Sequence, residues 1–402
     1  MLAVAEPLIG VINAGSSSLK FSFYEGERRI LTGQVDGIGA RPSASATGPD
    51  GEKIMPPDLG AKPPTVPSEV LPAILPWARE QLGGRRLAAV GHRVVHGGLR
   101  YSRPARVTPE LLAELEALVP LAPLHEPYNL APIKLAMTLN PELPQVACFD
   151  TAFHRTAPEV DQAFALPYSF FEQGVRRYGF HGLSYEYIAS HLPEVAPEIA
   201  KGQIIVAHLG SGASLCALHD GKSVDTTMGF TAVEGLCMGT RPGSIDPGAV
   251  LYLFQNLGLS VKEVEAILYK KSGLIGISGI SNDMRDLLGR EEPEAKLAVD
   301  YFIYRISKEI GALAAALGGV DALVFTAGIG ENSPEIRRRV CEASAWLGLQ
   351  LDQEANEQKA DRISTSQSKI SIWVIPTNEE LMIALHTGTL LGLRSQTAEQ
   401  AA

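Results

Sequence analysis

Residues 13–20, NAGSSSLK, form a short polar loop between two apolar stretches near the start of the sequence. Gly15 allows a ligand to approach the backbone closely, the serines at 16–18 offer hydroxyl and amide donors, and Lys20 adds a positive charge. Together these groups suit the binding of a phosphate. A solvated β-turn uses the same residue types, so the loop alone leaves both interpretations open.

Three further stretches contain the cationic or donor groups that phosphoryl transfer needs. Arg93 lies in GHRVVHGG at 91–98, His181 in YGFHG at 178–182 and Arg241 in GTRPGSIDP at 239–247. Phosphoryl transfer requires positive groups around the transferred phosphoryl, a bridging metal and a group that holds the nucleophile. Two of the residues also have plainer explanations, because Arg241 fits a surface ion pair and His181 fits a buried core histidine.

Two carboxylates follow predicted strands. Asp150 comes directly after the apolar stretch 145–149, and Glu379 lies in PTNEE after the strand predicted at 370–375. Both positions are also compatible with plain helix caps.

A glycine-rich stretch, Gly328–Asn332, precedes Ser333 and Pro334, which are typical of a helix N-cap and first turn. Such a loop can contact a nucleotide, although an ordinary turn from strand to helix uses the same residues. The sequence has no GxxxxGK[ST] and no GxGxxG after a strand, which disfavours P-loop and Rossmann folds.

The elements that must position these groups are predicted to occur twice. Apolar residues on both sides of the first polar loop predict a hairpin that turns at Glu25–Gly26. The stretch 204–221 repeats this pattern, and Gly15 and Gly210, like Gly26 and Gly221, are separated by 195 residues. The repeat implies two similar domains whose hairpin tips face a shared cleft, although a match this short can also arise by chance.

The rest of the chain predicts alternating helices and strands. Residues 40–68, rich in Pro, Gly and Asp, predict an irregular surface segment. Further helices are predicted near 69–82, 111–119 and 298–317, and further strands at 87–90 and 322–326.

Length and composition favour a globular protein of two domains, since 402 residues exceed one ordinary core and 45% are hydrophobic. A net charge of −10 argues against nucleic acid or an anionic membrane as partner. Cys148, Cys216, Cys237 and Cys341 lie far apart, which indicates core thiols in a reducing compartment. No signal peptide and no apolar run of membrane-spanning length is evident, so we expect a cytoplasmic protein.

The combination of motifs resembles the acetokinase family, in the superfamily that also holds sugar kinases, Hsp70 and actin. The likeness spans nearly the whole chain. Its motifs are NAGSSSLKF at 13–21, GHRVVHGG at 91–98, FDTAFH at 149–154, RRYGFHGLSY at 176–185, HLGSGAS at 208–214, MGFTAVEGLCMGTRPGSIDPG at 228–248, SNDMRDL at 281–287, FTAGIGENS at 325–333 and PTNEEL at 376–381.

The resemblance implies an α/β protein with a duplicated two-domain, actin-like (ribonuclease H-like) fold and a cleft between the domains. Residues 1–150, joined by a C-terminal helix at about 380–402, would form one domain, and 151–379 the nucleotide-binding domain. The implied activity is reversible in-line phosphoryl transfer between ATP and acetate, giving ADP and acetyl phosphate. Magnesium, with manganese as a substitute, and a homodimer that binds neither nucleic acid nor membrane are implied as well.

Site residues follow from the resemblance position by position. Asp150 takes the catalytic acid position, while His181 and Arg241 match groups that stabilise the transition state. The other implied contacts are Arg93 for the substrate carboxylate, Lys20 for nucleotide phosphate, and Asn13 with Glu379 for magnesium. The acyl pocket is expected at Val95, Leu124, Phe180 and Ala232. Three nucleotide-binding segments comprise His208, Leu209, Gly210, Ser211, Gly212, Asp283, Met284, Arg285, Gly328, Ile329, Gly330, Glu331 and Asn332.

Two positions depart from the family pattern. Ser211 stands where many members carry Asn, which shortens one donor near the phosphates, and Ala232 stands where Pro is frequent, which widens the expected acyl pocket. A propionate or butyrate kinase is therefore the nearest alternative. An actin-like or Hsp70-like ATP-dependent binding protein is the alternative from another class, although it would not need Arg93, Asp150 and His181 together.

Overall fold

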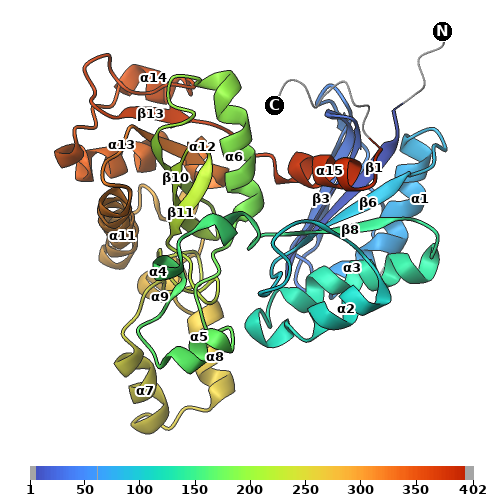
Figure 1. Cartoon of the computed structure of the whole chain (residues 1–402), viewed down its shortest axis with the longest axis horizontal. Helices are drawn as coiled ribbons and strands as arrows, with labels where there is room; N and C mark the ends of the chain where they lie inside the picture. Colours follow the sequence, from blue (N-terminus) through green and yellow to red (C-terminus); the bar gives the residue numbers. More distant parts are fainter. Residues whose placement is uncertain (1–5, 61, 394–402) are drawn as a thin grey trace. The chain divides into compact units, whose positions relative to one another are not determined.

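The computed structural model describes residues 6–60 and 62–393, whose contacts divide them into two compact units (Figure 1). The first unit comprises the described residues up to Ala152 and those from Asn378 onward. The second unit is Phe153–Thr377.

The first unit is built on a sheet of eight strands. They are β1 (Leu8–Ala14), β2 (Leu19–Glu25), β3 (Arg28–Asp36), β4 (Ser43–Thr47), β5 (Lys53–Ile54), β6 (Ala89–Val94), β7 (Ala105–Arg106) and β8 (Gln145–Phe149), in the order β5-β4-β3-β2-β1-β6-β8-β7. The hairpin strands β1, β2 and β3 pair antiparallel, whereas β1, β6 and β8 run parallel. The carboxyl ends of these three parallel strands therefore meet at one edge of the sheet.

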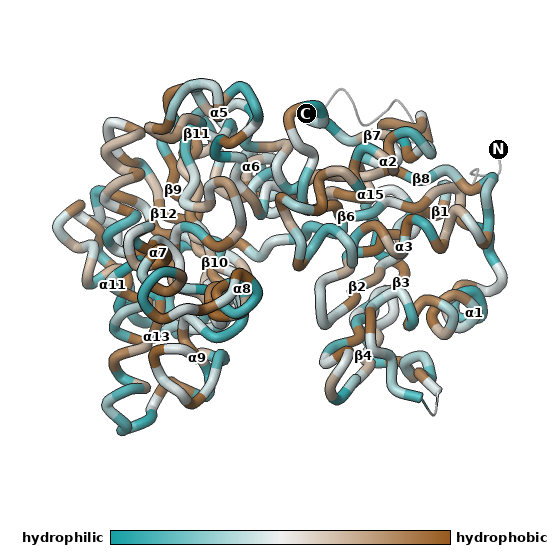
Figure 2. Tube along the Cα trace, turned by 90° about the horizontal axis from the view of Figure 1, so that it is seen from below, coloured by the Kyte–Doolittle hydropathy of each residue, from teal (hydrophilic) through white to brown (hydrophobic). Residues whose placement is uncertain are grey.

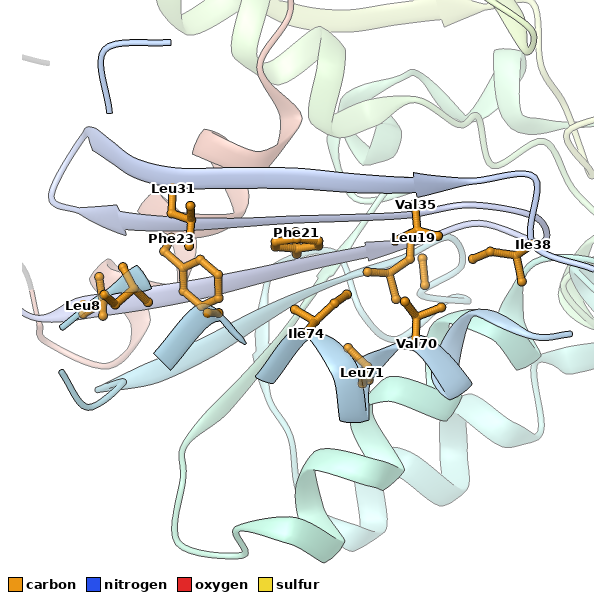
Figure 3. Close-up of a cluster of buried hydrophobic side chains, with 13 residues drawn as sticks. Leu8, Leu19, Phe21, Phe23, Leu31, Val35, Ile38, Val70, Leu71 and Ile74 are labelled. Carbon is orange, nitrogen blue, oxygen red and sulfur yellow. The ribbon is translucent and has the colours of Figure 1, made fainter. Parts of the chain in front are cut away.

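Helices pack against the apolar side chains of this sheet. They are α1 (Leu71–Gln81), α2 (Pro109–Glu116), α3 (Glu126–Leu139) and α15 (Glu379–Leu390), with the 3₁₀ turns η1 (Pro67–Val70) and η2 (Val119–Leu121). Alternate side chains of β2, including Leu19, Phe21 and Phe23, point at Leu71 and Ile74 of α1 and form a buried cluster (Figure 3). The period of two in the strand and of nearly four in the helix produces the two facing apolar surfaces.

The second unit contains five strands and a larger set of helices. The strands are β9 (Gln203–Leu209), β10 (Ala213–His219), β11 (Lys222–Thr226), β12 (Ala322–Thr326) and β13 (Ser371–Val374), in the order β11-β10-β9-β12-β13. The helices are α4 (Glu159–Gln162), α5 (Tyr168–Glu172), α6 (Gly182–Val195), α7 (Pro247–Gln255), α8 (Val261–Lys270), α9 (Gly273–Ser278), α10 (Met284–Leu287), α11 (Pro293–Leu317), α12 (Ala327–Asn332), α13 (Pro334–Ala343) and α14 (Gln353–Glu357), with the 3₁₀ turns η3 (Phe153–Thr156) and η4 (Ala345–Leu347).

The predicted duplication is confirmed by the strand order. The series β11-β10-β9-β12-β13 repeats β3-β2-β1-β6-β8, with the same parallel and antiparallel pairings. The bounds of β9 are those of β1 displaced by the predicted 195 residues, and both hairpins turn at a glycine with positive φ, Gly26 (55°) and Gly221 (70°). In the second unit α6 and α11 lie on opposite sides of the sheet (Figure 1).

Three sequence predictions are wrong in part. The segment 40–68 is not irregular throughout, because β4 and β5 extend the sheet, and its small residues Ala44 and Ala46 carry only a weak strand signal. The strand predicted at 87–90 runs from Ala89 to Val94, so Arg93 lies on a strand. Residues 328–332 belong to helix α12 and are not a loop.

The last helix ends at Leu390, before the predicted bound of about 402, and residues 394–402 lie outside the described part of the chain. All four cysteines are buried, as predicted for core thiols. Figure 2 shows hydrophobic and hydrophilic stretches interspersed along the chain. Among the described residues, no helix is long and apolar enough to span a membrane.

Candidate active site

In the first unit, Arg93 and Asp150 form a two-pronged ion pair. Arg93 lies on β6, and Asp150 follows the neighbouring parallel strand β8. Arg93 Nε donates to Asp150 Oδ1 at 3.0 Å, and Arg93 Nη2 donates to Asp150 Oδ2 at 2.5 Å. The Asp150 residue is 1% exposed, whereas the Arg93 side chain keeps 18% of its surface exposed, so the carboxylate holds the guanidinium from the buried side.

Asn13, on β1, joins this pair to the start of α15. Its Oδ1 accepts from Arg93 Nη1 at 3.2 Å, and its Nδ2 donates to Glu380 Oε1 at 3.0 Å and to Glu379 Oε2 at 3.4 Å. Four predicted site residues, Asn13, Arg93, Asp150 and Glu379, are therefore brought together. Glu380 is a fifth member that sequence reasoning did not single out.

This cluster contains more negatively charged than positively charged groups. Burial by itself would lower the pKa of the Arg93 guanidinium, but Asp150, Glu379 and Glu380 outweigh that effect and raise it. Three carboxylates thus face one guanidinium. Within the described residues, no group of three His, Cys, Asp or Glu side chains is gathered that could hold a metal ion by itself.

Gly91 explains how α15 comes this close to β6. A Cβ at this position would overlap the side chains of Ile383 and Thr387 on α15. A glycine in the middle of a strand usually weakens the strand, and here it lets a helix approach the backbone. The close approach brings the start of α15, with Glu379 and Glu380, toward the ends of β1 and β6.

A buried polar layer on α3 supports the strand ends and was missed by sequence reasoning. Asn129 Oδ1 accepts from Val95 N at 2.9 Å, and Asn129 Nδ2 donates to Ala14 O at 2.6 Å. Glu126 Oε2 accepts from His96 N at 3.2 Å, and burial raises the pKa of Glu126 to about 8. The one available signal was two polar residues three positions apart in a helix whose other buried residues, Leu130, Pro132 and Ile133, are apolar.

The remaining predicted residues of the first unit lie near this cluster. Lys20 is exposed on β2, opposite Asn13 in the hairpin register, and lines a pocket of about 360 Å³ together with Glu380. Val95, buried, follows β6 directly, and Leu124 is half-buried before α3.

In the second unit, His181 stands in a left-handed conformation directly before α6, with φ 58° and ψ 23°. Its Nδ1 lies 2.8 Å from Ser214 Oγ, on β10. Its ring stacks on that of His208, with ring centres 4.2 Å apart and an angle of 16° between the planes. A non-glycine residue rarely adopts this backbone conformation, and such residues are frequent at functional sites.

His181 and Arg241 converge beside Gly212. A Cβ placed on Gly212 would lie 2.7 Å from Arg241 Nη2 and 3.2 Å from His181 Nε2. Arg241 Nη1 donates to Ala232 O at 2.6 Å, which fixes one side of the guanidinium. Two predicted catalytic groups therefore present nitrogens to one glycine of a predicted nucleotide-binding segment.

The segment 208–212 is a tight turn fixed to its neighbours. Gly210 N donates to Gly212 O, and Gly239 N donates to Ser211 O, both at 3.0 Å. The Ser211 side chain is exposed, whereas Leu209 is fully buried, so Leu209 can offer a ligand only its backbone.

The other two predicted nucleotide-binding segments adjoin this turn. A Cβ on Gly239 would lie 3.0 Å from the carbonyl oxygen of Asn282, the residue before Asp283. The Asp283 side chain caps α10, and its Oδ2 lies 2.5 Å from Nη2 of Arg285. A Cβ on Gly210 would lie 3.9 Å from the Cβ of Ala327, at the start of α12. The structure therefore brings the three segments together, with Met284 buried and Arg285 exposed.

Helix α12 is held from both ends. The Glu331 carboxylate accepts from Ala327 N at 2.8 Å and from Thr377 N at 3.2 Å, and Asn332 Nδ2 donates to Gly328 O at 3.0 Å. Gly328 has open space where a side chain would stand, Gly330 is buried and Ile329 is half-buried. The Glu331 side chain thus binds backbone, whereas the exposed Asn332 side chain also accepts from Lys359 Nζ at 3.1 Å. The backbone near Gly328 remains open to a ligand.

Arg337 is the main residue of this region that sequence reasoning missed. It is fully buried, and its Nη1 donates to Gly330 O at 2.9 Å and to Glu331 O at 3.0 Å. It thereby satisfies carbonyls at the end of α12. The signal was its place on the apolar face of α13 between Ile336 and Val340, where an arginine is unexpected.

The four residues predicted for the acyl pocket divide between the units. Val95 and Leu124 belong to the first unit, and Phe180 and Ala232 to the second. Phe180 is buried, and its carbonyl accepts from His154 Nε2 at 2.9 Å. No single unit contains the whole predicted wall.

Fold and site together define a class of protein. Each unit has the same strand order, and the first gathers charged groups where its parallel strands end. The second gathers backbone turns and cationic donors. This is the duplicated actin-like architecture of phosphotransferases that use ATP.

Comparison with known proteins identifies the family within this class. Residues 8–385 match the model of the acetokinase family, and the chain belongs to that family. It is 56% identical over 397 residues to an acetate kinase of Nitrobacter hamburgensis, a match that covers 96% of this chain and 97% of the relative.

Solved structures agree in fold. A propionate kinase from Francisella tularensis superposes with a TM-score of 0.87 at 38% identity, covering 94% of this chain and 98% of that one. An acetate kinase from Porphyromonas gingivalis gives 0.83 at 40% identity, covering 96% and 100%.

Proposed function

We propose that this chain catalyses reversible phosphoryl transfer between ATP and acetate, giving ADP and acetyl phosphate. The observation that carries the proposal is the convergence of Arg241 Nη2 and His181 Nε2 beside Gly212, in the turn that adjoins the other two nucleotide-binding segments. Charge that develops on the equatorial oxygens of the transferring phosphoryl needs such donors, already oriented.

The first unit would supply the acceptor side. Arg93 would bind the acetate carboxylate through guanidinium N–H groups that do not donate to Asp150. Asp150 would serve as the catalytic acid. Val95, Leu124, Phe180 and Ala232 would line the methyl group. Lys20, in a polar pocket with Glu380, would contact a nucleotide phosphate.

Magnesium fits the donor set of the first unit. Glu379 and Glu380 offer carboxylate oxygens, which magnesium prefers, and Asn13 has an amide oxygen that in this structure accepts from Arg93 Nη1. The surplus negative charge of the three carboxylates around Arg93 would be reduced by a divalent cation. A site with few protein ligands is usual for magnesium bound with substrate phosphates. We propose that Asn13 and Glu379 hold the ion, which would neutralise phosphate charge when bound; manganese would substitute.

Further proposals concern the setting. We propose a cytoplasmic homodimer whose ligands are small molecules, with neither nucleic acid nor membrane as partner. The net charge of −10 supports this choice of ligands. We also propose that residues 1–150 with the last helix, and residues 151–379, act as the two domains.

A propionate kinase is the second candidate, because Ala232 is smaller than the proline frequent in the family and a related structure is named a propionate kinase. One methylene changes specificity by about 10–200-fold in an apolar pocket. We expect acetate to be preferred, with propionate used within about a hundredfold. A butyrate kinase would need a still larger pocket.

One assay tests both candidates. ADP release is measured with ATP, magnesium and unbranched carboxylates of one to five carbons, and acyl phosphate is trapped with hydroxylamine. The proposal predicts ADP release that depends on the carboxylate and one trapped acyl group per ADP. ATP hydrolysis indifferent to the carboxylate would favour an actin-like or Hsp70-like ATPase.

A further inference from the structure

The imidazole of His181 and four neighbouring side chains are linked by hydrogen bonds and ring stacking. His181 Nδ1 lies 2.8 Å from Ser214 Oγ, which lies 2.5 Å from Tyr185 Oη. His208, stacked on His181, has its Nδ1 2.8 Å from Ser184 Oγ. Ser184 and Tyr185 come from the first turn of α6, while His208 and Ser214 are paired residues of β9 and β10. One helical turn and one strand pair therefore hold both rings.

The protons of this set can be assigned by following the hydrogen bonds. Tyr185 and Ser214 are both fully buried. In the described part of the chain, the Tyr185 hydroxyl has one hydrogen-bond partner, Ser214 Oγ, and burial raises the pKa of the phenol, which keeps its proton. An unsatisfied buried hydroxyl donor costs about 1–3 kcal/mol, so Tyr185 donates and Ser214 Oγ accepts.

Among the residues that the structure describes, the Ser214 proton then has one hydrogen-bond acceptor, Nδ1 of the His181 imidazole. If His181 Nδ1 carried a hydrogen, Ser214 Oγ would accept from two donors and its own proton would be left without an acceptor. If Nδ1 is bare, every proton of the three groups is used. A neutral imidazole with a bare Nδ1 carries its hydrogen on Nε2, the nitrogen that faces Gly212 and Arg241.

We propose that Tyr185 and Ser214 form a relay of hydrogen bonds that fixes the tautomer of His181, with its hydrogen on Nε2, the nitrogen beside Gly212. The inference rests on the proposed function, in which that donor meets the transferring phosphoryl. Tyr185 and Ser214 are positioning residues, since they act through His181. With the relay in place, His181 can donate to a phosphoryl oxygen without first gaining a proton.

The stacked His208 ring supports this assignment. Two parallel imidazoles 4.2 Å apart would repel each other if both were charged, so the stack disfavours the state in which both rings carry a proton on each nitrogen. Ser184 serves His208 as Ser214 serves His181, which makes Ser184 a matched comparison. The two serines differ in which histidine they contact.

The tautomer can be read directly by ¹⁵N NMR on the full chain labelled at its nine histidines. The His181 signals are identified by their loss in His181→Gln. At neutral pH, wild type should show His181 with hydrogen on Nε2 and a hydrogen-bonded, bare Nδ1. Ser214→Ala should abolish the Nδ1 signature and yield a mixture of tautomers, whereas Ser184→Ala should change His208 and leave the His181 tautomer in place.

Tyr185→Phe provides a second variant that removes a single oxygen and leaves the ring. It frees the Ser214 hydroxyl to turn, so a partial tautomer mixture is expected. In kinetics, Ser214→Ala should lower kcat about tenfold, the effect of about 1.4 kcal/mol, with KM for ATP and acetate within about threefold. Tyr185→Phe should give a smaller loss.

The outcomes separate the relay from the proposed function. Hydrogen on Nδ1 of wild-type His181, or an unchanged His181 signature in Ser214→Ala, would overturn the relay whatever the activity. A changed tautomer with unchanged kcat would overturn its role in turnover. The predicted tautomer in a protein without carboxylate-dependent ADP release would leave the relay standing and refute the proposed function.

Discussion

Substitution of Gly212 by alanine tests whether Arg241 and His181 must stand where the structure has them. The new Cβ would lie 2.7 Å from Arg241 Nη2 and 3.2 Å from His181 Nε2, whereas ordinary van der Waals contact begins near 3.4 Å. Gly212 has no positive φ, so the substitution adds a steric clash without backbone strain. The guanidinium must therefore move by about 0.7 Å while its other side is held by Ala232 O.

A displacement of about 1 Å in a catalytic group can cost about a hundredfold in rate. We therefore expect Gly212→Ala to lower kcat about 30- to 100-fold in the ADP-release assay, with a thermal midpoint within a few degrees of wild type, because the clash falls on movable side-chain ends. Turnover within threefold of wild type, in a folded variant, would refute the placement of both donors.

Gly311→Ala is the matched control for this substitution. Gly311 lies within α11, where a Cβ would make ordinary contact with the Trp346 ring at 3.4 Å. We expect unchanged kinetics and a gain in stability of up to about 1 kcal/mol, because alanine is a better helix former.

The remaining predictions use the same assays. Arg241→Ala should lower kcat by about 10³ with little change in KM for ATP. Arg241→Lys should recover little of this activity, because an ammonium group cannot contact two oxygens as the planar guanidinium does. If the alanine variant keeps more than a tenth of the wild-type kcat, Arg241 has no transition-state role. Ala232→Pro should increase the preference for acetate over propionate about tenfold or more, and it keeps the backbone carbonyl that accepts from Arg241. An unchanged ratio of acetate to propionate turnover would show that Ala232 does not line the acyl pocket. Glu126 has its pKa raised by burial to about 8, so the folded state binds the proton more tightly and the contribution of Glu126 to stability should fall as pH rises from about 4.5 to 8. Glu126→Gln removes this contribution, so wild type should lose stability relative to the variant across this range. A constant difference between the two thermal midpoints from about pH 4.5 to 8 would contradict the prediction.

Sequence patterns predicted the hairpins and several elements because their signals are local. Alternating apolar residues and a turn glycine specify β1 with β2 and β9 with β10 without reference to the rest of the chain. Where a local signal conflicted with packing, prediction failed. The strand was predicted to end at residue 90, yet Gly91 and His92 lie within β6, where α15 packs closely on the strand and needs the glycine.

Recognition of the motifs indicated which residue types belong to the site, but it did not indicate their contacts. Asn13 and Glu379 are separated by 366 positions and Arg93 and Asp150 by 57, and neither separation carries a periodic signal. Arg337 was missed for the same reason, since its partners are carbonyls that only folding brings within reach.

The sequence by itself determined the family, the duplicated strand pattern and the polar residues that the two hairpins and their following loops present. The tertiary structure decided which nitrogen of His181 faces Gly212, which side of Arg241 is held by Ala232, and which carboxylates face Arg93. The physical reason is the range over which each kind of interaction acts. Strand and turn preferences act between neighbours in the chain, whereas the hydrogen bonds and charges of the site act between neighbours in space.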